Sequence, residues 1–213
     1  MSLAFTNEWY IFNGGAIDKK TCDRIKRWAS KKWESSSVDT SKDTTDEERK
    51  TGRKGDYKPD PKTRISDIAW CNDQWLYDII FPHMNKANDE SGWRYHIKAS
   101  EPVQITRYKK GGFYNFHQDG VGDQLSAYNN PQNAFMHGHV RKLSMATFLS
   151  ASYEGGEFQF ASYGKEECEI STPEFSKVGS IVVFPSAMEH RVASITKGVR
   201  YSLVTWFVGP PFV

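Results

Sequence analysis

The spacing of hydrophobic residues changes along the chain, and it predicts helices first and strands afterwards. After a short apolar run at residues 9–12, which is typical of a strand, Asp18 can cap a helix of about 15 residues that runs to Trp33. A second helix is predicted at residues 73–89, with a kink at Pro82. The apolar positions of the first helix recur every three or four residues and give it one buried face: Cys22, Ile25, Trp28 and Ala29.

Short runs of β-branched and aromatic residues, separated by turn residues, fill the chain from Trp93 onward. An earlier run at residues 63–70 also predicts a strand. Many strands after two helices favour an all-β core, a sandwich or a barrel, with the helices packed on one side. The predicted strands beyond Trp93 are residues 95–99, 103–108, 113–119, 142–150, 156–162, 180–185, 190–194 and 200–208.

Two long polar segments interrupt these elements within what we expect to be a single domain of residues 1–213. Residues 34–62 contain almost nothing apolar, so they predict a loop that is mobile when nothing is bound and that serves as a lid or binding loop. Between Arg49 and Arg64 this segment has seven Lys or Arg against two Asp, although a plain solvated loop is the alternative. A second polar loop is predicted at residues 120–140.

Composition narrows the classes of function and of location. The net charge of +2 gives no argument for a nucleic acid or an anionic membrane as partner, and no stretch approaches the roughly 20 apolar residues of a membrane helix. The N-terminal stretch lacks the basic and apolar regions of a secretory signal. Three scattered cysteines, Cys22, Cys71 and Cys168, argue against a disulfide framework, so we expect a cytoplasmic protein.

A His-x-Asp triplet that joins His117 and Asp119 ends one of the predicted strands. Residues two apart on a strand project to the same face, so both side chains can reach one point. With a second histidine they match the two-histidine, one-carboxylate site of non-haem iron oxygenases. His190 is the natural third ligand, with His137 and His139 as rivals in the second polar loop. A structural histidine beside a turn aspartate is the alternative.

Arg200 gives this candidate site its weight. Residues 190–195 and 200–207 flank a turn signal and predict a hairpin, in which His190 would face Val204. Arg200 would then share a face with His190, about 13 Å farther along the strand. A five-carbon dicarboxylate that chelates the metal at one end fits this space, because the guanidinium fork can bind its other carboxylate. An arginine turned to solvent at the strand end is the alternative.

Four blocks between Arg64 and Phe207 together resemble the 2-oxoglutarate/Fe(II) oxygenases of the prolyl 4-hydroxylase type. The last block is the most specific, because its strand ends in FPS and is followed by HRV and by an arginine ten residues past the histidine. The resemblance implies a mainly β fold, a double-stranded β-helix or jelly roll, with supporting N-terminal α-helices. The four blocks are RISDIAW, QITRYKKGGFYNFHQDG, KLSMATFLSASYEGGEFQF and VGSIVVFPSAMEHRVASITKGVRYSLVTWF.

The resemblance also implies the ligands of the site. Fe(II) would be held by His117, Asp119 and His190, and the co-substrate 2-oxoglutarate by Arg200. O2 would be the other co-substrate, with ascorbate as the reductant. Tyr108, nine residues before the His-x-Asp motif, matches a tyrosine that helps to hold 2-oxoglutarate in the family.

Other matched positions lie on the substrate side of the family's site. Tyr114 matches a residue that lines it, and Arg64 and Ser66 match an Arg-x-Ser element beside the peptide-binding loop of prolyl 4-hydroxylases. Trp206 matches a position near the metal, with a plain core tryptophan as the alternative. Phe148 is a departure, because some members have there a tyrosine whose hydroxyl reaches the 2-oxoglutarate carboxylate. Tyr108, a serine or threonine, or water would have to replace that contact.

The resemblance implies hydroxylation of an unactivated carbon with release of succinate and CO2, and it favours a prolyl residue in a peptide or protein as the substrate. Three alternatives stay open: a hydroxylase of a free amino acid or small metabolite, a nucleobase demethylase, and a non-catalytic cupin-like binding module. We therefore expect a peptide or protein partner, no stable nucleic-acid partner and no membrane association. The sequence leaves the oligomeric state open.

Overall fold

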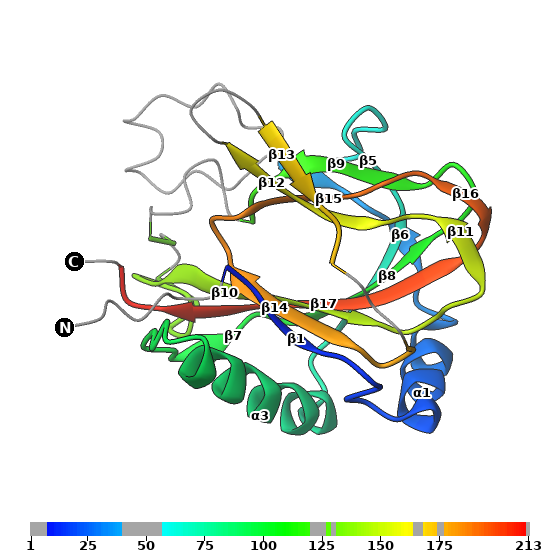
Figure 1. Cartoon of the computed structure of the whole chain (residues 1–213). Coiled ribbons are helices and arrows are strands. Elements are labelled where there is room, and N and C mark those ends of the chain that lie inside the picture. Colours follow the sequence, from blue (N-terminus) through cyan, green and yellow to red (C-terminus); the bar gives the residue numbers. More distant parts are fainter. Residues whose placement is uncertain are drawn as a thin grey trace.

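In the described part of the chain, two helices and the two larger β-sheets, which face each other, form three layers (Figure 1). The helices lie on the outer face of the larger sheet, and the smaller sheet lies across its other face. The predicted jelly roll with supporting helices is confirmed. Among the residues described, no helix is long and apolar enough to cross a membrane. The structure, a computed structural model, describes residues 8–39, 57–119, 127–128, 131–163, 168–173 and 177–211.

Helix α1 (Lys19–Ala29) begins where the sequence predicts. The Asp18 carboxylate accepts a hydrogen bond from the backbone N–H of Thr21 (2.9 Å) and so caps the helix. The helix ends before the predicted Trp33, because the Ser30 hydroxyl donates to the carbonyl three residues earlier (2.7 Å) and the chain turns away. The buried face holds three of the predicted residues: Cys22, Ile25 and Ala29.

Helix α3 (Gln74–Glu90) matches the predicted second helix to within one residue, with Asp73 at its N-cap. Pro82 lies inside the helix, on its exposed side, so the missing backbone N–H falls where water can reach the chain. The opposite side packs on the larger sheet through four buried apolar residues: Leu76, Ile80, Met84 and Ala87.

The larger sheet is antiparallel and forms the floor of the central cavity. β7 (Ala99–Ser100) pairs with one of its central strands, β17. In spatial order its other strands are β1 (Tyr10–Phe12), β14 (Ile181–Pro185), β10 (Val140–Phe148), β17 (Arg200–Gly209), β8 (Val103–Tyr108), β6 (Asp67–Cys71) and β2 (Glu34–Ser35).

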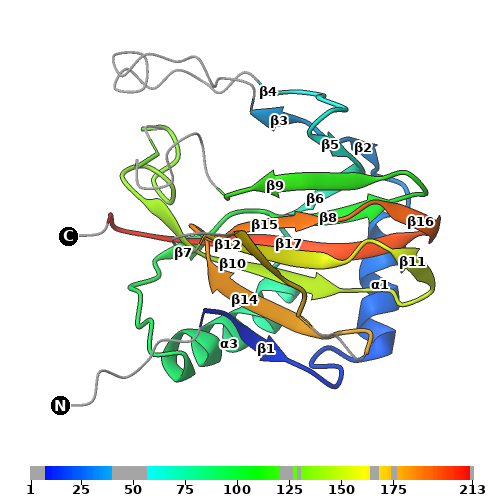
Figure 2. The same cartoon turned by 45° about the horizontal axis from the view of Figure 1, so that its top comes forward.

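The smaller sheet covers the cavity from the other side. Two short pairs extend the structure: β11 (Tyr153–Gly155) with β16 (Ile195–Gly198), and β3 (Val38–Asp39) with β4 (Tyr57–Lys58), which lies beyond the β5 edge (Figure 2). The strands of the smaller sheet, in spatial order, are β13 (Cys168–Ser171), β12 (Phe158–Tyr163), β15 (Glu189–Val192), β9 (Phe113–His117) and β5 (Arg64–Ile65).

Each face of the larger sheet has its own apolar core. On β10, Leu143 and Met145 face the helices, whereas Ala146 and Phe148 face the smaller sheet. This period of two places alternate side chains of one strand in two different environments. The polar residues that point towards the smaller sheet therefore line the cavity between the sheets.

The predicted hairpin of residues 190–195 and 200–207 is wrong. β15 joins the smaller sheet and β17 the larger one, and the supposed turn residues form β16, which pairs with β11. The backbone of Gly198 has a φ of 78°, and a Cβ there would lie 2.5 Å from the Ser152 carbonyl oxygen. The glycine thus permits a close backbone approach at a crossover between sheets rather than a tight turn.

Two strand assignments also need correction. Residues 63–70 form not one strand but two, β5 and β6, which lie in different sheets and are separated at Ser66. Only the end of the predicted strand at 95–99 is extended, as part of β7. A run of β-forming residues does not reveal which neighbour each half will pair with, and pairing decides the strand.

The two predicted polar loops are only partly described. Residues 34–39 and 57–62 contain the short strands β2, β3 and β4, and residues 40–56 lie outside the described part of the chain. Within the second loop, residues 131–139 form turns. The lid remains a prediction.

Candidate active site

Three predicted metal ligands meet between the two sheets. His117 ends β9 and His190 lies directly opposite it on the neighbouring strand β15. Asp119 follows two residues after His117, and one donor atom from each of the three residues lies within 4.8 Å of the others. The Asp119 carboxylate oxygens are 3.7 Å from His117 Nε2 and 3.5 Å from His190 Nε2. In the described part of the chain, no other cluster of this kind occurs, so His137 and His139 are not supported as ligands.

Backbone carbonyls hold both imidazole rings in one orientation. His117 Nδ1 lies 2.8 Å from the Asn115 carbonyl oxygen, and His190 Nδ1 lies 2.9 Å from that of Met188. An Nδ1–H that donates to a carbonyl leaves the lone pair on Nε2, the atom that faces Asp119. The Nε2 atoms of both histidines are therefore available to a metal.

The Asp119 carboxylate is buried, and serines of the larger sheet hold it. Ser144 Oγ donates to Asp119 Oδ2 (2.6 Å) and also contacts Ser186 Oγ (2.9 Å). Burial by itself would raise the pKa of Asp119, but nearby His190 and His117 and the Ser144 hydrogen bond lower it overall. The group is thus an ionised carboxylate at neutral pH, as a metal ligand must be.

His117 remains neutral for a related reason. Burial, together with the neighbouring His190, lowers the pKa of His117 to about 3. The Tyr114 ring stacks on the imidazole, with ring centroids 3.5 Å apart. Two imidazoles and one carboxylate on a single side of a cavity suit a divalent iron-type metal and leave coordination positions open. The donor set therefore fits the metal that the sequence predicts.

Arg200 is the second decisive feature of the cavity. It is only 1% exposed, and one of its nitrogens donates to the Ser202 hydroxyl (3.2 Å). Its other two guanidinium nitrogens, Nε and Nη2, are buried without a hydrogen-bond partner. No described carboxylate forms an ion pair with it. A buried charge without a partner is costly, so an anionic ligand is needed to complete this site.

Polar groups of β8 and β17 lie beside this guanidinium. Arg200 pairs with Tyr108 across the two strands, and Ser202 pairs with Thr106. Thr106 is fully buried and its hydroxyl has no partner. The ring of Phe148, the family departure, lies 5.0 Å from the guanidinium carbon. Ser202 lines the cavity, and the buried Thr106 lies beside it in register. The sequence singled out neither residue, and both carry a hydroxyl group near the guanidinium, where Phe148 has none.

The triad and Arg200 line one cavity of about 160 Å³. Tyr108, Tyr114, Trp206 and Arg64 line it as well, so these predicted residues are brought together. Ser66 does not line it; its hydroxyl instead accepts a hydrogen bond from Arg64 Nε (2.9 Å). The remaining lining includes residues that the sequence did not single out, among them Gln104, Ser37, Ile68, Trp70, Arg141 and Val192.

Arg141 is a functional candidate that the sequence did not single out. It pairs through two hydrogen bonds with Glu101 (2.5 and 2.6 Å), and its guanidinium carbon lies 4.2 Å from the centre of the Trp206 ring. Glu101 outweighs the effect of burial and raises the pKa of Arg141, so the positive charge persists near Asp119. From the sequence alone, an arginine at the start of a strand is expected to be exposed to solvent. Its partner Glu101 is 40 residues away in the sequence, so no nearby residue indicates the ion pair.

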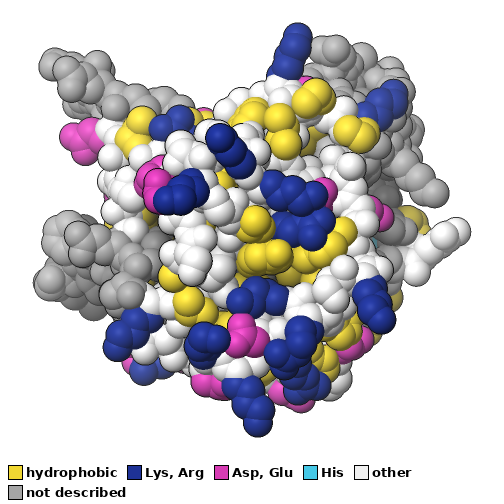
Figure 3. Space-filling model, turned by 90° about the vertical axis from the view of Figure 1, so that its right-hand side faces the viewer, with side chains coloured by type: hydrophobic (Ala, Val, Ile, Leu, Met, Phe, Trp, Pro, Cys, Tyr) yellow, Lys and Arg dark blue, Asp and Glu magenta, His cyan; other side chains and the backbone are white. Residues whose placement is uncertain are grey.

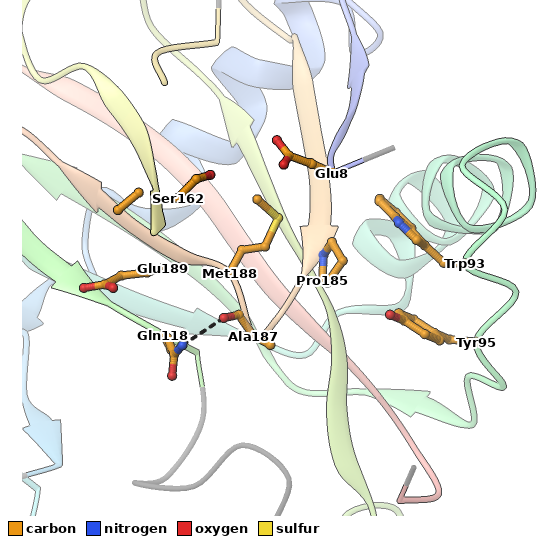
Figure 4. Close-up of a pocket in the computed structure, with 10 residues that line it drawn as sticks. Glu8, Trp93, Tyr95, Gln118, Ser162, Pro185, Ala187, Met188 and Glu189 are labelled. Carbon is orange, nitrogen blue, oxygen red and sulfur yellow. Dashed lines mark hydrogen bonds between the residues drawn. The ribbon is translucent and has the colours of Figure 1, made fainter. Parts of the chain in front are cut away.

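Gln118 lines another pocket, of about 380 Å³, as well as the central cavity (Figure 4). Gln118, between the two metal ligands of its loop, donates through Nε2 to the Ala187 carbonyl oxygen (3.0 Å). This bond ties the loop that carries Asp119 to the turn before His190. Gln118 thus helps to fix the relative positions of the ligands.

A sequence profile of the 2OG-Fe(II) oxygenase superfamily matches residues 103–208, the stretch that contains the triad and Arg200. The chain belongs to this superfamily. Curated relatives include PKHD-type hydroxylase Smlt1146 of Stenotrophomonas maltophilia (strain K279a), which is 32% identical over 114 residues. A PKHD-type hydroxylase of Cupriavidus metallidurans is 35% identical over 112 residues. Each match covers 49% of this chain and 42% of the relative, so the chain spans less than half the length of these relatives.

Solved structures with the same fold include prolyl hydroxylases. The viral collagen prolyl hydroxylase from Paramecium Bursaria Chlorella virus-1 has a TM-score of 0.61 at 17% identity, with 98% of this chain and 99% of that chain covered. A prolyl hydroxylase from Trichoplax adhaerens, in complex with a peptide fragment of hypoxia inducible factor, has a TM-score of 0.62 at 15% identity, with 95% and 84% covered. At these identities the likeness establishes the jelly-roll fold.

Proposed function

We propose that the chain is an Fe(II)- and 2-oxoglutarate-dependent dioxygenase that hydroxylates a prolyl residue in a peptide or protein. The observation that carries the proposal is the buried guanidinium of Arg200, which lacks a counter-charge and lines the same cavity as a complete metal-ligand set. An anion held by Arg200 and a metal held by the triad would complete the two halves of this cavity.

His117, Asp119 and His190 would hold Fe(II), and the serine contacts of Asp119 would keep the carboxylate in place. Bound Fe(II), with 2-oxoglutarate and O2, supplies the oxidising chemistry that yields succinate, CO2 and a hydroxyl on the substrate carbon. Ascorbate would serve as the external reductant. The protein's own part is to orient the ligands and to keep the cavity narrow.

Arg200 would bind the far carboxylate of 2-oxoglutarate through its two unpaired nitrogens. Tyr108 lies beside it in register, and the hydroxyls of Thr106 and Ser202 are available as further donors. These hydroxyls would replace the tyrosine contact that Phe148 cannot make. The co-substrate would then be held at both ends, by the metal and by the guanidinium.

The substrate side would be formed by Arg64, Tyr114 and Trp206. Arg64 is 8% exposed, lies 4.6 Å from the centre of the Tyr114 ring, and donates to the Gln104 side chain (3.1 Å). Ser66 would position Arg64 through their hydrogen bond. The prolyl substrate is proposed by analogy with structural neighbours that are prolyl hydroxylases, one of them in complex with a peptide.

The test is 2-oxoglutarate turnover by the purified protein with Fe(II) and ascorbate. We expect succinate to form slowly without substrate and faster with an accepted proline peptide. His117→Ala should lose the metal, whereas Arg200→Ala should keep the metal and lose 2-oxoglutarate affinity. No succinate, together with no binding of 2-oxoglutarate to the metal-loaded protein, would overturn the proposal.

A free amino acid or small metabolite is the second candidate substrate, favoured by the small volume of the cavity, about 160 Å³. An array of proline peptides, read by mass spectrometry, separates the two. A gain of one oxygen on a peptide supports the peptide substrate. Turnover that responds to free amino acids and to no peptide supports the metabolite.

A further inference from the structure

A second groove, of about 280 Å³, adjoins the central cavity. Arg64 lines both of them. The chain before β3 also borders both, because Ser36 lines the groove and the next residue, Ser37, lines the cavity. The groove and the central cavity are therefore neighbours on either side of Arg64.

The groove carries an excess of positive charge. Its lining contains four cationic side chains and one carboxylate, Asp67. Arg107 donates twice to that carboxylate (2.9 and 2.7 Å) and Lys109 Nζ lies 3.0 Å from it, so Asp67 is already fully engaged. The exposed Lys110 forms no ion pair with any described residue. The cations are Arg64, Arg107, Lys109 and Lys110.

The two lysines are displayed on a rigid turn. The backbone N–H of Gly112 donates to the Lys109 carbonyl (2.8 Å) and closes a four-residue turn. Gly111, the third residue of this turn, has a φ of 82°, and a turn of this type requires a positive φ there. The Gly111 N–H is in turn bonded to the Ile195 carbonyl (2.8 Å), which anchors the turn to β16. Because the backbone is fixed, little ordering is needed when an anion binds.

Lys and Arg side chains gather on the end of the molecule that carries β16, the strand to which the lysine turn is bonded (Figure 3). Helix α1 lies at this end of the molecule and adds exposed cations, including Arg24 and Arg27. Its Asp23 is engaged by lysines on both sides, Lys19 (2.8 Å) and Lys26 (2.9 Å). The positive electrostatic potential of these side chains raises the local concentration of an anionic partner and steers its approach.

We propose that this groove binds an acidic segment of the substrate polypeptide, adjacent to the residue that is hydroxylated. The inference rests on the proposed function, because the groove gains its meaning from its position next to the catalytic cavity. Substrates would carry Asp or Glu within a few residues of the target on one side.

A peptide fits the lining better than a nucleic acid does. Pro59, Pro61 and the 45% exposed Ile65 add apolar surface beside the cations, which suits a polypeptide with mixed side chains. Nucleic-acid affinity comes from a long row of phosphate contacts, typically six or more. The groove offers a short cluster, of which two members already share Asp67.

The test uses two fluorescein-labelled synthetic peptides with a central proline, one flanked by glutamates and the other by glutamines. Binding to the full chain, loaded with Mn(II) and 2-oxoglutarate, is followed by fluorescence anisotropy. We expect the glutamate peptide to bind roughly tenfold more tightly at low salt, the combined effect of several partly exposed charge pairs. The difference should shrink as the salt concentration rises.

The deciding variant is the double charge reversal Lys109→Glu with Lys110→Glu, accompanied by the milder Lys109→Gln with Lys110→Gln. Both should remove most of the preference for the glutamate peptide and leave 2-oxoglutarate affinity unchanged, which shows that the site is folded. The matched control is Lys86→Glu with Lys98→Glu, an equal change of charge at exposed positions that line none of the pockets. The control should keep the preference.

Equal binding of the two peptides, or a preference that survives both lysine pairs of substitutions, overturns the inference. So does a single-stranded oligothymidine that competes more strongly than the glutamate peptide and depends on the same lysines, which would assign the groove to nucleic acid. Failure of the proposed function is distinguished by the succinate assay. Turnover without an acidic preference rejects the groove alone, whereas an acidic preference without turnover rejects the catalytic proposal alone.

Discussion

Arg200 illustrates how a single residue is prepared for a ligand. Its guanidinium is buried with two nitrogens unpaired, a state that disfavours the ligand-free protein. Replacing it by an apolar side chain of similar length should remove this penalty. We predict that Arg200→Met leaves the Tm of the ligand-free protein unchanged or raised, while 2-oxoglutarate affinity falls roughly 100-fold. Thermal unfolding with and without 2-oxoglutarate measures both effects, and a strongly lowered Tm without ligand would contradict the prediction.

Thr106 can be compared with a second buried threonine, Thr147, that lies on the other face of the sheet. Thr106 and Thr147 are both fully buried with unpaired hydroxyls, but Thr106 shares a face with Tyr108 whereas Thr147 shares a face with Met145, towards the helices. We predict that Thr106→Val weakens 2-oxoglutarate binding roughly fivefold, the loss expected for one hydrogen bond. Thr147→Val should not change it. Isothermal titration calorimetry of the Mn(II)-loaded variants with 2-oxoglutarate measures both affinities. Equal effects of the two substitutions would show that Thr106 does not contribute to the binding site.

Single residues were predictable from sequence where a short motif carried them. The triplet predicted that His117 and Asp119 meet at one point, and they do, although Asp119 lies just beyond the end of β9 rather than on the strand. Arg200 lines the predicted cavity although the predicted hairpin is wrong. β17, which carries Arg200, and β15, which carries His190, lie in different sheets, and both side chains point into the cavity between them. Thr106 and Arg141 were not predictable, since their roles depend on partners that are close only in the fold.

At the scale of elements, the crossover between β15 and β17 is the part of the fold that the sequence did not reveal. A glycine between two β-forming runs is compatible with a turn and with a close strand contact, and only packing distinguishes them. Here Gly198 meets the Ser152 carbonyl and so permits β16 to pair with β11. The existence and type of most other elements followed from periodicity, because each buries one face.

The same glycine yields a prediction about the crossover. Gly198 and Gly138 have similar φ values, 78° and 75°, but a Cβ at Gly138 would meet nothing within 4 Å. We predict that Gly198→Ala destabilises the fold by ~1–3 kcal/mol more than Gly138→Ala, because only the first adds a steric clash to the backbone strain. Urea unfolding of both variants measures the difference. Equal losses would mean that the backbone conformation alone matters.

For the whole molecule, the metal site joins the two sheets. His117 and His190 belong to the smaller sheet, whereas Ser144, which holds Asp119, belongs to the larger one. We predict that Mn(II) raises the Tm in a concentration-dependent way, that a chelator reverses the rise, and that His190→Ala abolishes it. An equal rise in the His190→Ala variant would place the metal elsewhere.

The location of these groups on separate sheets also sets a length. The triad belongs mostly to the smaller sheet and Arg200 to the larger, and packed sheets keep a spacing of about 10 Å. If a metal on the triad and Arg200 hold the two ends of a diacid, as proposed, the cavity would act as a molecular ruler, since neither end can shift without moving a whole sheet. A four-carbon keto diacid would then fall short of one end and a six-carbon one would have to buckle, so the two-sheet architecture itself would select the co-substrate.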